Sequence, residues 1–100
     1  MTAESQSSWF TLLDDDYVTL RIEVVENLPY LHCDVHRWSK ESYKHMLQMW
    51  HHIRKACIDN DILFMFAWAE TSKIDHFARM FGMQPIFEAP NGISLLFMRL

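Results

Sequence analysis

An uninterrupted apolar run, Ile62 to Ala69 (ILFMFAWA), constrains this chain more than any other feature. Consecutive side chains of a strand point to opposite faces, so a strand that is apolar at every position is typical of a sheet interior covered on both faces. The run is too short to cross a membrane, which requires about 20 apolar residues. The sequence therefore predicts a central strand, covered on both faces and placed beside a parallel neighbour.

Alternating patterns upstream of this run predict two further strands. Residues 17–25 place apolar side chains at every second position, the period of a half-buried strand, and residues 30–36 alternate in the same way. Between them, Glu26-Asn27-Leu28-Pro29 favours a turn, because Pro29 has no N–H to donate to a central ladder. These segments predict an antiparallel hairpin or meander.

The N-terminal region contributes one more short strand. Residues 1–8 are polar and rich in serine, so we expect a flexible tail there. The apolar run Trp9 to Leu13 follows and stops at Asp14-Asp15-Asp16. Three adjacent carboxylates repel one another and favour a solvated turn, while one contiguous run supplies poor geometry for a cation.

Two segments have helical spacing. Ser39 is a suitable N-cap for a long helix over residues 40–58, which carries one apolar stripe. A second helix is expected to begin near Ser72, with Asp75 as its capping-box partner, and to end at Gly82.

Two strands complete the predicted order. Residues 83–88 and 93–100 flank Ala89-Pro90-Asn91-Gly92, where Asn-Gly is a strong hairpin signal. The order β-β-β-α-β-α-β-β predicts one mixed α/β (α+β) domain over residues 9–100, with a mostly antiparallel mixed sheet packed by two helices. We expect four large side chains to pack together between the long helix, the central strand and the second helix: Trp50, Phe64, Phe66 and Phe77.

Composition excludes several classes of protein. One hundred residues, of which 50% are hydrophobic, suit a single folded domain. A net charge of −4 and a pI near 5.8 argue against a nucleic-acid binder, which usually carries a basic stripe. Two cysteines are too few for a disulfide scaffold, and the first residues lack the features of a secretory signal. We therefore expect a soluble protein of a reducing cytoplasm.

Histidines and cysteines are present without a catalytic or metal-ligating pattern. His32 and His36 are four residues apart on a predicted strand, roughly 13 Å, which is too far to share one ion. Cys33 and Cys57 fall on apolar faces, where cysteine usually acts as a small hydrophobe. We expect no metal site and no catalytic nucleophile.

The segment Ile62 to Phe87 resembles the GNAT acyltransferase fold. In that family a central apolar strand is followed by a loop, a short helix with an aromatic–small–Gly ending, and a returning strand. Residues 77–83 (FARMFGM) stand where the family has Phe-Tyr-x-x-Leu-Gly-Phe, and residues 31–58 match its acetyl-CoA-binding strand and helix in order and length. The resemblance covers residues 17–100 and is nearest to compact GNAT-like proteins of tailed bacteriophages, including virion and assembly-associated ones.

Departures from the family pattern affect the expected function. GNAT enzymes hold the cofactor pyrophosphate with a Gly-containing turn before the long helix, whereas residues 35–44 (VHRWSKESYK) contain no glycine. Ala78 stands where the family has its catalytic tyrosine, and the helices that cover the acceptor substrate have no counterpart before the first strands. The resemblance with these losses implies a catalytically inactive, phage-encoded binding or structural protein that has no cofactor and acts through protein contacts. The alternative is an acyl-CoA-dependent N-acetyltransferase with a degenerate cofactor loop, for which acetyl-CoA would be the cofactor.

The candidate binding site is a basic-aromatic cluster. His36, Arg37, Trp38 and Lys40 are expected at the mouth of the V-shaped cleft that GNAT proteins open between two central strands, here 30–36 and 62–69. Arg and Trp are favoured interface anchors, so we expect this cluster to contact an acidic or aromatic segment of a host or virion protein. The competing interpretation is that Trp38 packs on the sheet and the cations are solvated. We expect no nucleic-acid or membrane partner, and the oligomeric state stays open.

Overall fold

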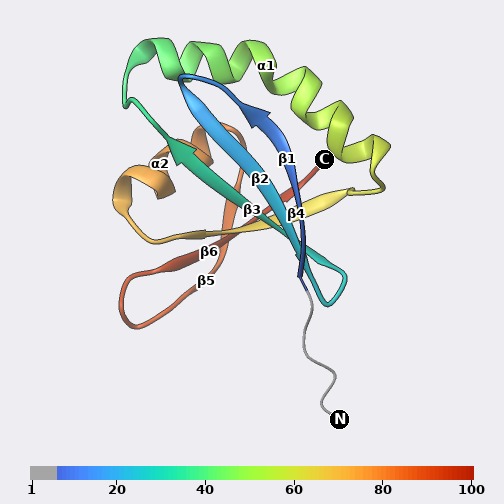
Figure 1. Cartoon of the computed structure of the whole chain (residues 1–100). Helices are drawn as coiled ribbons and strands as arrows, with labels where there is room; N and C mark the ends of the chain where they lie inside the picture. The colour runs from blue at the N-terminus through green and yellow to red at the C-terminus, as the bar shows by residue number, and fades with distance from the viewer. Residues whose placement is uncertain (1–6) are drawn as a thin grey trace.

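Six strands and two helices follow one another in the predicted order (Figure 1). The computed structural model describes residues 7–100. The first strand begins at Ser7, inside the predicted tail, and the rest of that tail lies outside the described residues. The elements are β1 (Ser7–Asp14), β2 (Val18–Val25), β3 (Leu28–Val35), α1 (Lys40–Asp59), β4 (Phe64–Ala69), α2 (Ser72–Met80), β5 (Gln84–Glu88) and β6 (Ser94–Arg99).

The strands form one mixed sheet in the order β1-β2-β3-β4-β6-β5. All neighbours are antiparallel except β3 and β4, which are parallel and are joined by the single pair Tyr30↔Phe66. Helix α1 connects these two strands along the crossover that a parallel pair requires. The predicted central position of β4, beside a parallel neighbour, is confirmed. Neither helix within residues 7–100 has the length and apolar character of a membrane span.

The β2–β3 hairpin is tighter than the predicted four-residue turn. Its turn is Glu26-Asn27, both at positive φ (52° and 67°), as in a type I′ turn, and Val25↔Leu28 closes it. Pairs of an antiparallel ladder alternate between hydrogen-bonded and non-hydrogen-bonded, so the next pair, Val24↔Pro29, needs no N–H from the proline. The expectation that proline stays outside this strand is therefore wrong.

The helices begin and end as their caps require. Ser39 caps α1 as predicted, because its Oγ accepts from the N–H of Ser42 at 3.2 Å. The cap of α2 is Thr71, one residue before the predicted Ser72, and it accepts from Ile74 N–H at 3.2 Å. Gly82 ends α2 at φ +98°, and its N–H and that of the following residue bond back to the last turn of the helix in a Schellman motif.

Both helices pack on one face of the sheet, and the hydrophobic core lies between the helices and that face. The buried side chains of β4 are Met65, Ala67 and Ala69, whereas Trp68 points to the opposite face and is 45% exposed. The prediction that β4 is covered on both faces is therefore wrong. The fully buried large side chains are Val18, Leu20, Ile22, Ile53, Met65 and Leu96.

The predicted aromatic cluster is divided between the two faces. Phe77 and Trp50 lie on the helix side, and both contact the ring of Phe81, at centroid distances of 5.1 and 5.5 Å. Phe64 and Phe66 lie on the other side, where each contacts the ring of Phe97, at 5.9 and 5.4 Å. Alternation along β4 separates them from the helices, so the prediction of one four-residue cluster is wrong.

The acidic turn between β1 and β2 has a structural role. Asp15 Oδ1 accepts from the N–H groups of Tyr17 and Val18 at 2.8 and 3.0 Å, and its Oδ2 is hydrogen-bonded to His45 Nε2 of α1. Partial burial raises the pKa of Asp15, but the hydrogen bonds from His45, Tyr17 and Val18 outweigh this and lower the pKa overall. The turn therefore fixes the start of α1 to the sheet as well as reversing the chain.

We expect Asp15→Asn to lower the free energy of unfolding at neutral pH by about 1 kcal/mol, as for loss of a side-chain cap. A lowered folded-state pKa means that the carboxylate contributes fully above its unfolded value of 3.8 and loses the contribution as pH falls through the folded value. Urea unfolding from neutral to acidic pH should therefore show the two proteins converging below about pH 4. Asp16→Asn, in the exposed neighbour, is the control. An equal loss in both variants would contradict the role of Asp15.

Candidate functional site

A V-shaped cleft opens in the middle of the sheet, because β3 and β4 diverge after Tyr30↔Phe66. Along β3 the backbone N–H and C=O groups point alternately to β2 and to β4. Those of Cys33 point toward β4, but β4 has already diverged there and forms no further pair with β3. The resulting cavity measures about 400 Å³. Its wall is mostly apolar, and the side chains that it receives from the two helices are Met46, Trp50, Ile74, Phe77, Ala78 and Phe81. The predicted splay of these strands is confirmed.

The cleft contains few groups suited to acyl transfer. Burial, with a smaller contribution from the charge of Asp34, raises the pKa of Cys33 to about 12, so the thiol is protonated at neutral pH and is no nucleophile. Burial likewise raises the pKa of Cys57 to about 11. Ala78 lines the cavity with a methyl group, which cannot donate a proton. Besides Cys33, the titratable side chains that line the cleft are Arg21, Tyr30, His32, Asp34 and Glu70.

A second cavity, of about 360 Å³, lies between the start of α1 and α2. Arg37, Trp38 and Lys40 line one side, and Lys73 and His76 of α2 line the other. We call this cavity the basic groove. Sequence reasoning missed the α2 residues, although the spacing of Lys73, His76 and Met80 (i, i+3, i+7) places them on one helix face.

Trp38 is held on one side and open on the other. Its ring meets Phe77 edge-on at a centroid distance of 5.4 Å, and the ammonium of Lys73 lies 5.9 Å from its centroid. The side chain is nevertheless 44% exposed, so Trp38 does not belong to the buried core. The exposed part of the indole is therefore accessible between the cations of the groove.

The N-terminus of α1 is closed by its own side chains. Ser39 Oγ accepts one of the first helical N–H groups, and the buried hydroxyl of Ser42 donates to the carbonyl of Arg37 at 2.5 Å, which fixes the loop. Glu41 adds a carboxylate to the first turn, where it interacts favourably with the helix dipole and opposes a second anion. Ser39 Oγ therefore occupies one of the helical N–H groups that could otherwise face a bound anion.

His36 lies apart from the other candidate residues. It hydrogen-bonds through Nε2 to Thr19 Oγ1 at 2.8 Å, with Asp34 at 3.8 Å from its Nδ1, and it lines neither cavity. The structure thus places Arg37, Trp38 and Lys40 in the basic groove rather than at the V-shaped cleft, and places His36 directly after β3, beside Thr19 of β2. Within residues 7–100 no three His, Cys, Asp or Glu side chains gather closely enough to hold a metal ion.

Comparison with known proteins gives a match in structure and none in sequence. No family model matches the chain, and no curated protein matches it significantly. A crystal structure of a "putative acetyltransferase from Agrobacterium tumefaciens" superposes with a TM-score of 0.57 at 10% identity, over 97% of this chain and 77% of that one. At this identity the likeness concerns the fold alone. The chain therefore has a mixed α/β, GNAT-like fold that resembles an acetyltransferase structure.

Proposed function

We propose that this chain is a catalytically inactive, GNAT-like binding protein whose basic groove takes an acidic segment, containing aromatic residues, of a partner protein. The observation that carries the proposal is the half-exposed Trp38 among three cations on a chain of net charge −4. Charge complementarity would guide encounter and orientation, while the indole would supply most of the affinity. The resemblance to bacteriophage GNAT-like proteins favours a host or virion protein as partner.

The alternative is an acyl-CoA-dependent N-acetyltransferase with a degenerate cofactor loop. Its support is the fold and the V-shaped cleft, into which an acyl carrier of extended shape could enter. Three observations favour the non-catalytic proposal: the capped N-terminus of α1, the methyl group of Ala78 and the protonated thiol of Cys33.

Titration calorimetry with acetyl-CoA separates these two functions. We expect no saturable heat at micromolar concentrations and no rise in Tm, because the loop before α1 offers no backbone cradle for the pyrophosphate. A dissociation constant in the low micromolar range, or stabilisation by several degrees, would favour the acetyltransferase instead.

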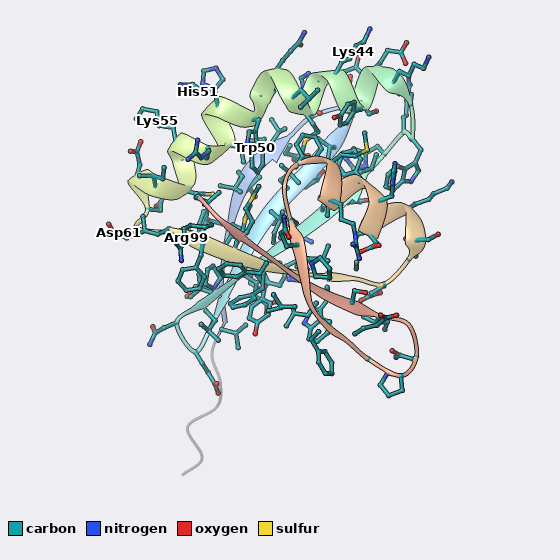
Figure 2. All side chains as sticks on the ribbon, turned by 180° about the vertical axis from the view of Figure 1, so that it is seen from behind. Lys44, Trp50, His51, Lys55, Asp61 and Arg99 are labelled. Atoms are coloured by element: carbon teal, nitrogen blue, oxygen red, sulfur yellow. The ribbon has the colours of Figure 1, made fainter. Side chains whose placement is uncertain are left out.

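Binding of a synthetic peptide tests the basic groove itself. We expect a Glu-rich peptide that contains Trp and Phe to bind, and Trp38→Ala and Arg37→Ala each to weaken binding about tenfold. Lys55→Ala is the matched control, because Lys55 is paired with Asp59 near the opposite end of α1 from Lys44 (Figure 2). A basic peptide that contains the same aromatic residues controls for charge.

Thermal melts accompany each titration. Trp38→Ala should keep a cooperative transition, because the indole is half exposed and its stacking on Phe77 is worth only about 0.5–1.5 kcal/mol. Absence of peptide binding, or an equal loss of affinity in Lys55→Ala, would contradict the assignment of the groove. An unfolded Trp38→Ala would show that the residue serves the fold.

A further inference from the structure

The face of the sheet opposite the helices carries a contiguous row of large apolar side chains. Strand register places Tyr30 of β3 beside Phe66 of β4, Phe66 beside Phe97 of β6, Trp68 beside Leu95, and Leu95 beside Phe87 of the edge strand β5. With Phe64, which contacts Phe66 and Phe97, these residues form a surface across four strands that we call the aromatic face. Neither helix covers it, because both pack on the other side.

The size of the aromatic face suits a protein interface. Trp68 and Phe87 are 45% and 53% exposed, and their five neighbours are partly buried. With about 150–250 Å² for a large side chain, the face exposes roughly 400–500 Å² of apolar surface. A standard interface buries about 800 Å² per partner, of which about 65% is apolar in homodimers, close to what this face provides.

The aromatic face has Arg99 at one end and the carboxylates of Asp34 and Glu70 at the other. Arg99 pairs across the ladder with Phe64 at the start of β4, and it is exposed. Glu70 follows the other end of β4, Asp34 of β3 lines the same cleft together with Arg21, and both carboxylates are exposed. A surface with opposite charges at its two ends is complementary to itself when a second copy is turned end over end.

We propose that two copies of this chain form an isologous dimer through the aromatic face, with the twofold axis in the plane between the sheets and across β4. In this arrangement Arg99 of each copy lies against the acidic end of the other, and Trp68 is buried between the sheets. Two sheets that pack face to face keep their strand axes within about 30° of each other. The two β4 strands meet this condition, because they run along the same line in opposite directions.

Other occupants fit the aromatic face less well. Residues 1–6 (MTAESQ) contain one large apolar side chain and cannot cover seven. Exposed aromatic side chains on a sheet can also stack nucleic-acid bases. Nucleic-acid binding, however, requires cations along the phosphate backbone, and this chain has a net charge of −4. The dimer is independent of the basic groove, which lies on the helix side between α1 and α2.

Sedimentation equilibrium and light scattering over a concentration series test the dimer with the full chain. We expect twice the chain mass of 12.0 kDa at high concentration and dissociation on dilution. Trp68→Lys should raise the dimer dissociation constant at least about tenfold, because it places a charge at the centre of the interface. Ile58→Lys is the control, because this side chain is 43% exposed on α1, which packs on the opposite face of the sheet, and the change should leave the dimer intact.

A charge exchange tests the orientation of the two copies. Arg99→Glu and Glu70→Arg should each weaken the dimer, since like charges then face each other, and the double variant should recover most of the affinity. Circular dichroism melts establish that each variant is folded. A monomeric wild type at all concentrations, or a dimer that Trp68→Lys does not weaken, would overturn the proposal. A double variant no tighter than the single ones would overturn the end-over-end arrangement.

Discussion

Phe77→Ala is expected to lower the free energy of unfolding by about 3–5 kcal/mol, a large share of the total stability of about 5–15 kcal/mol of a small domain. The ring is 8% exposed and stands at the centre of the contact between the two helices. Its centroid lies 5.4 Å from that of Trp38, 6.4 Å from that of Tyr43 and 5.1 Å from that of Phe81. Removal of the ring leaves a cavity that these rings cannot fill without leaving their present contacts.

Urea denaturation followed by far-UV circular dichroism measures this loss. Met80→Ala on the same helix is the control, because Met80 is 41% exposed and its truncation should cost less than about 1 kcal/mol. A loss below about 1 kcal/mol for Phe77→Ala would show that the helices do not depend on this ring. Should Phe77→Ala be unfolded in water, Phe77→Leu keeps the test quantitative, with a smaller loss expected.

Met65→Ala is expected to lower the free energy of unfolding by about 2–5 kcal/mol, because Met65, the second residue of β4, is 0% exposed. The side chain belongs to the core cluster that joins β2, β4 and β6 to both helices. Leu63→Ala, just before β4, is the control, because Leu63 is 60% exposed and its truncation should lower the free energy of unfolding only slightly. Equal losses in the two variants, measured by the same denaturation, would contradict the assignment of the helix-covered face of β4.

The order of elements could be predicted from the sequence because each element carries a local signal. Alternation marks β2 and β3, Ser39 caps α1, and Gly82 supplies the positive φ that ends α2. Local ambiguity explains the boundary errors: Thr71 and Ser72 are both good caps, and only the geometry shows which one accepts the hydrogen bond.

The covering of β4 could not be predicted from its apolar run. Phe64 and Phe66 shield one another and Phe97 on the face that the helices leave open, so a half-covered strand has the same sequence pattern as a fully covered one. The position of Pro29 was also predicted wrongly, because the sequence does not show how the ladder is phased. Its place in β3 depends on the phase of the ladder, which the two-residue turn Glu26-Asn27 sets and composition does not show.

The candidate site was predicted in part. Arg37, Trp38 and Lys40 are contiguous enough in sequence to be recognised as a cluster, and the structure brings them together in one groove. Lys73 and His76 come from a helix more than thirty residues later, and their proximity depends on the packing of α2 against α1. His36 was grouped with its neighbours by sequence, but strand alternation turns it toward Thr19.

The sheet consists of two halves, which we call leaves: β1–β2–β3 and β4–β6–β5. The pair Tyr30↔Phe66 is the single ladder pair that joins them. Within each leaf the ladders are nearly continuous, with eight pairs between β2 and β3 and six between β4 and β6. Between the leaves, the connection rests on α1 and on side-chain packing, because Ile22 of β2 shares a core cluster with Met65 of β4 and Leu96 of β6. A change in the angle between the leaves therefore breaks almost no main-chain hydrogen bonds, but it requires the side chains of this core cluster and of the helices to repack. We therefore expect the amide of Cys33, which has no ladder partner in β4, to exchange with solvent without global unfolding.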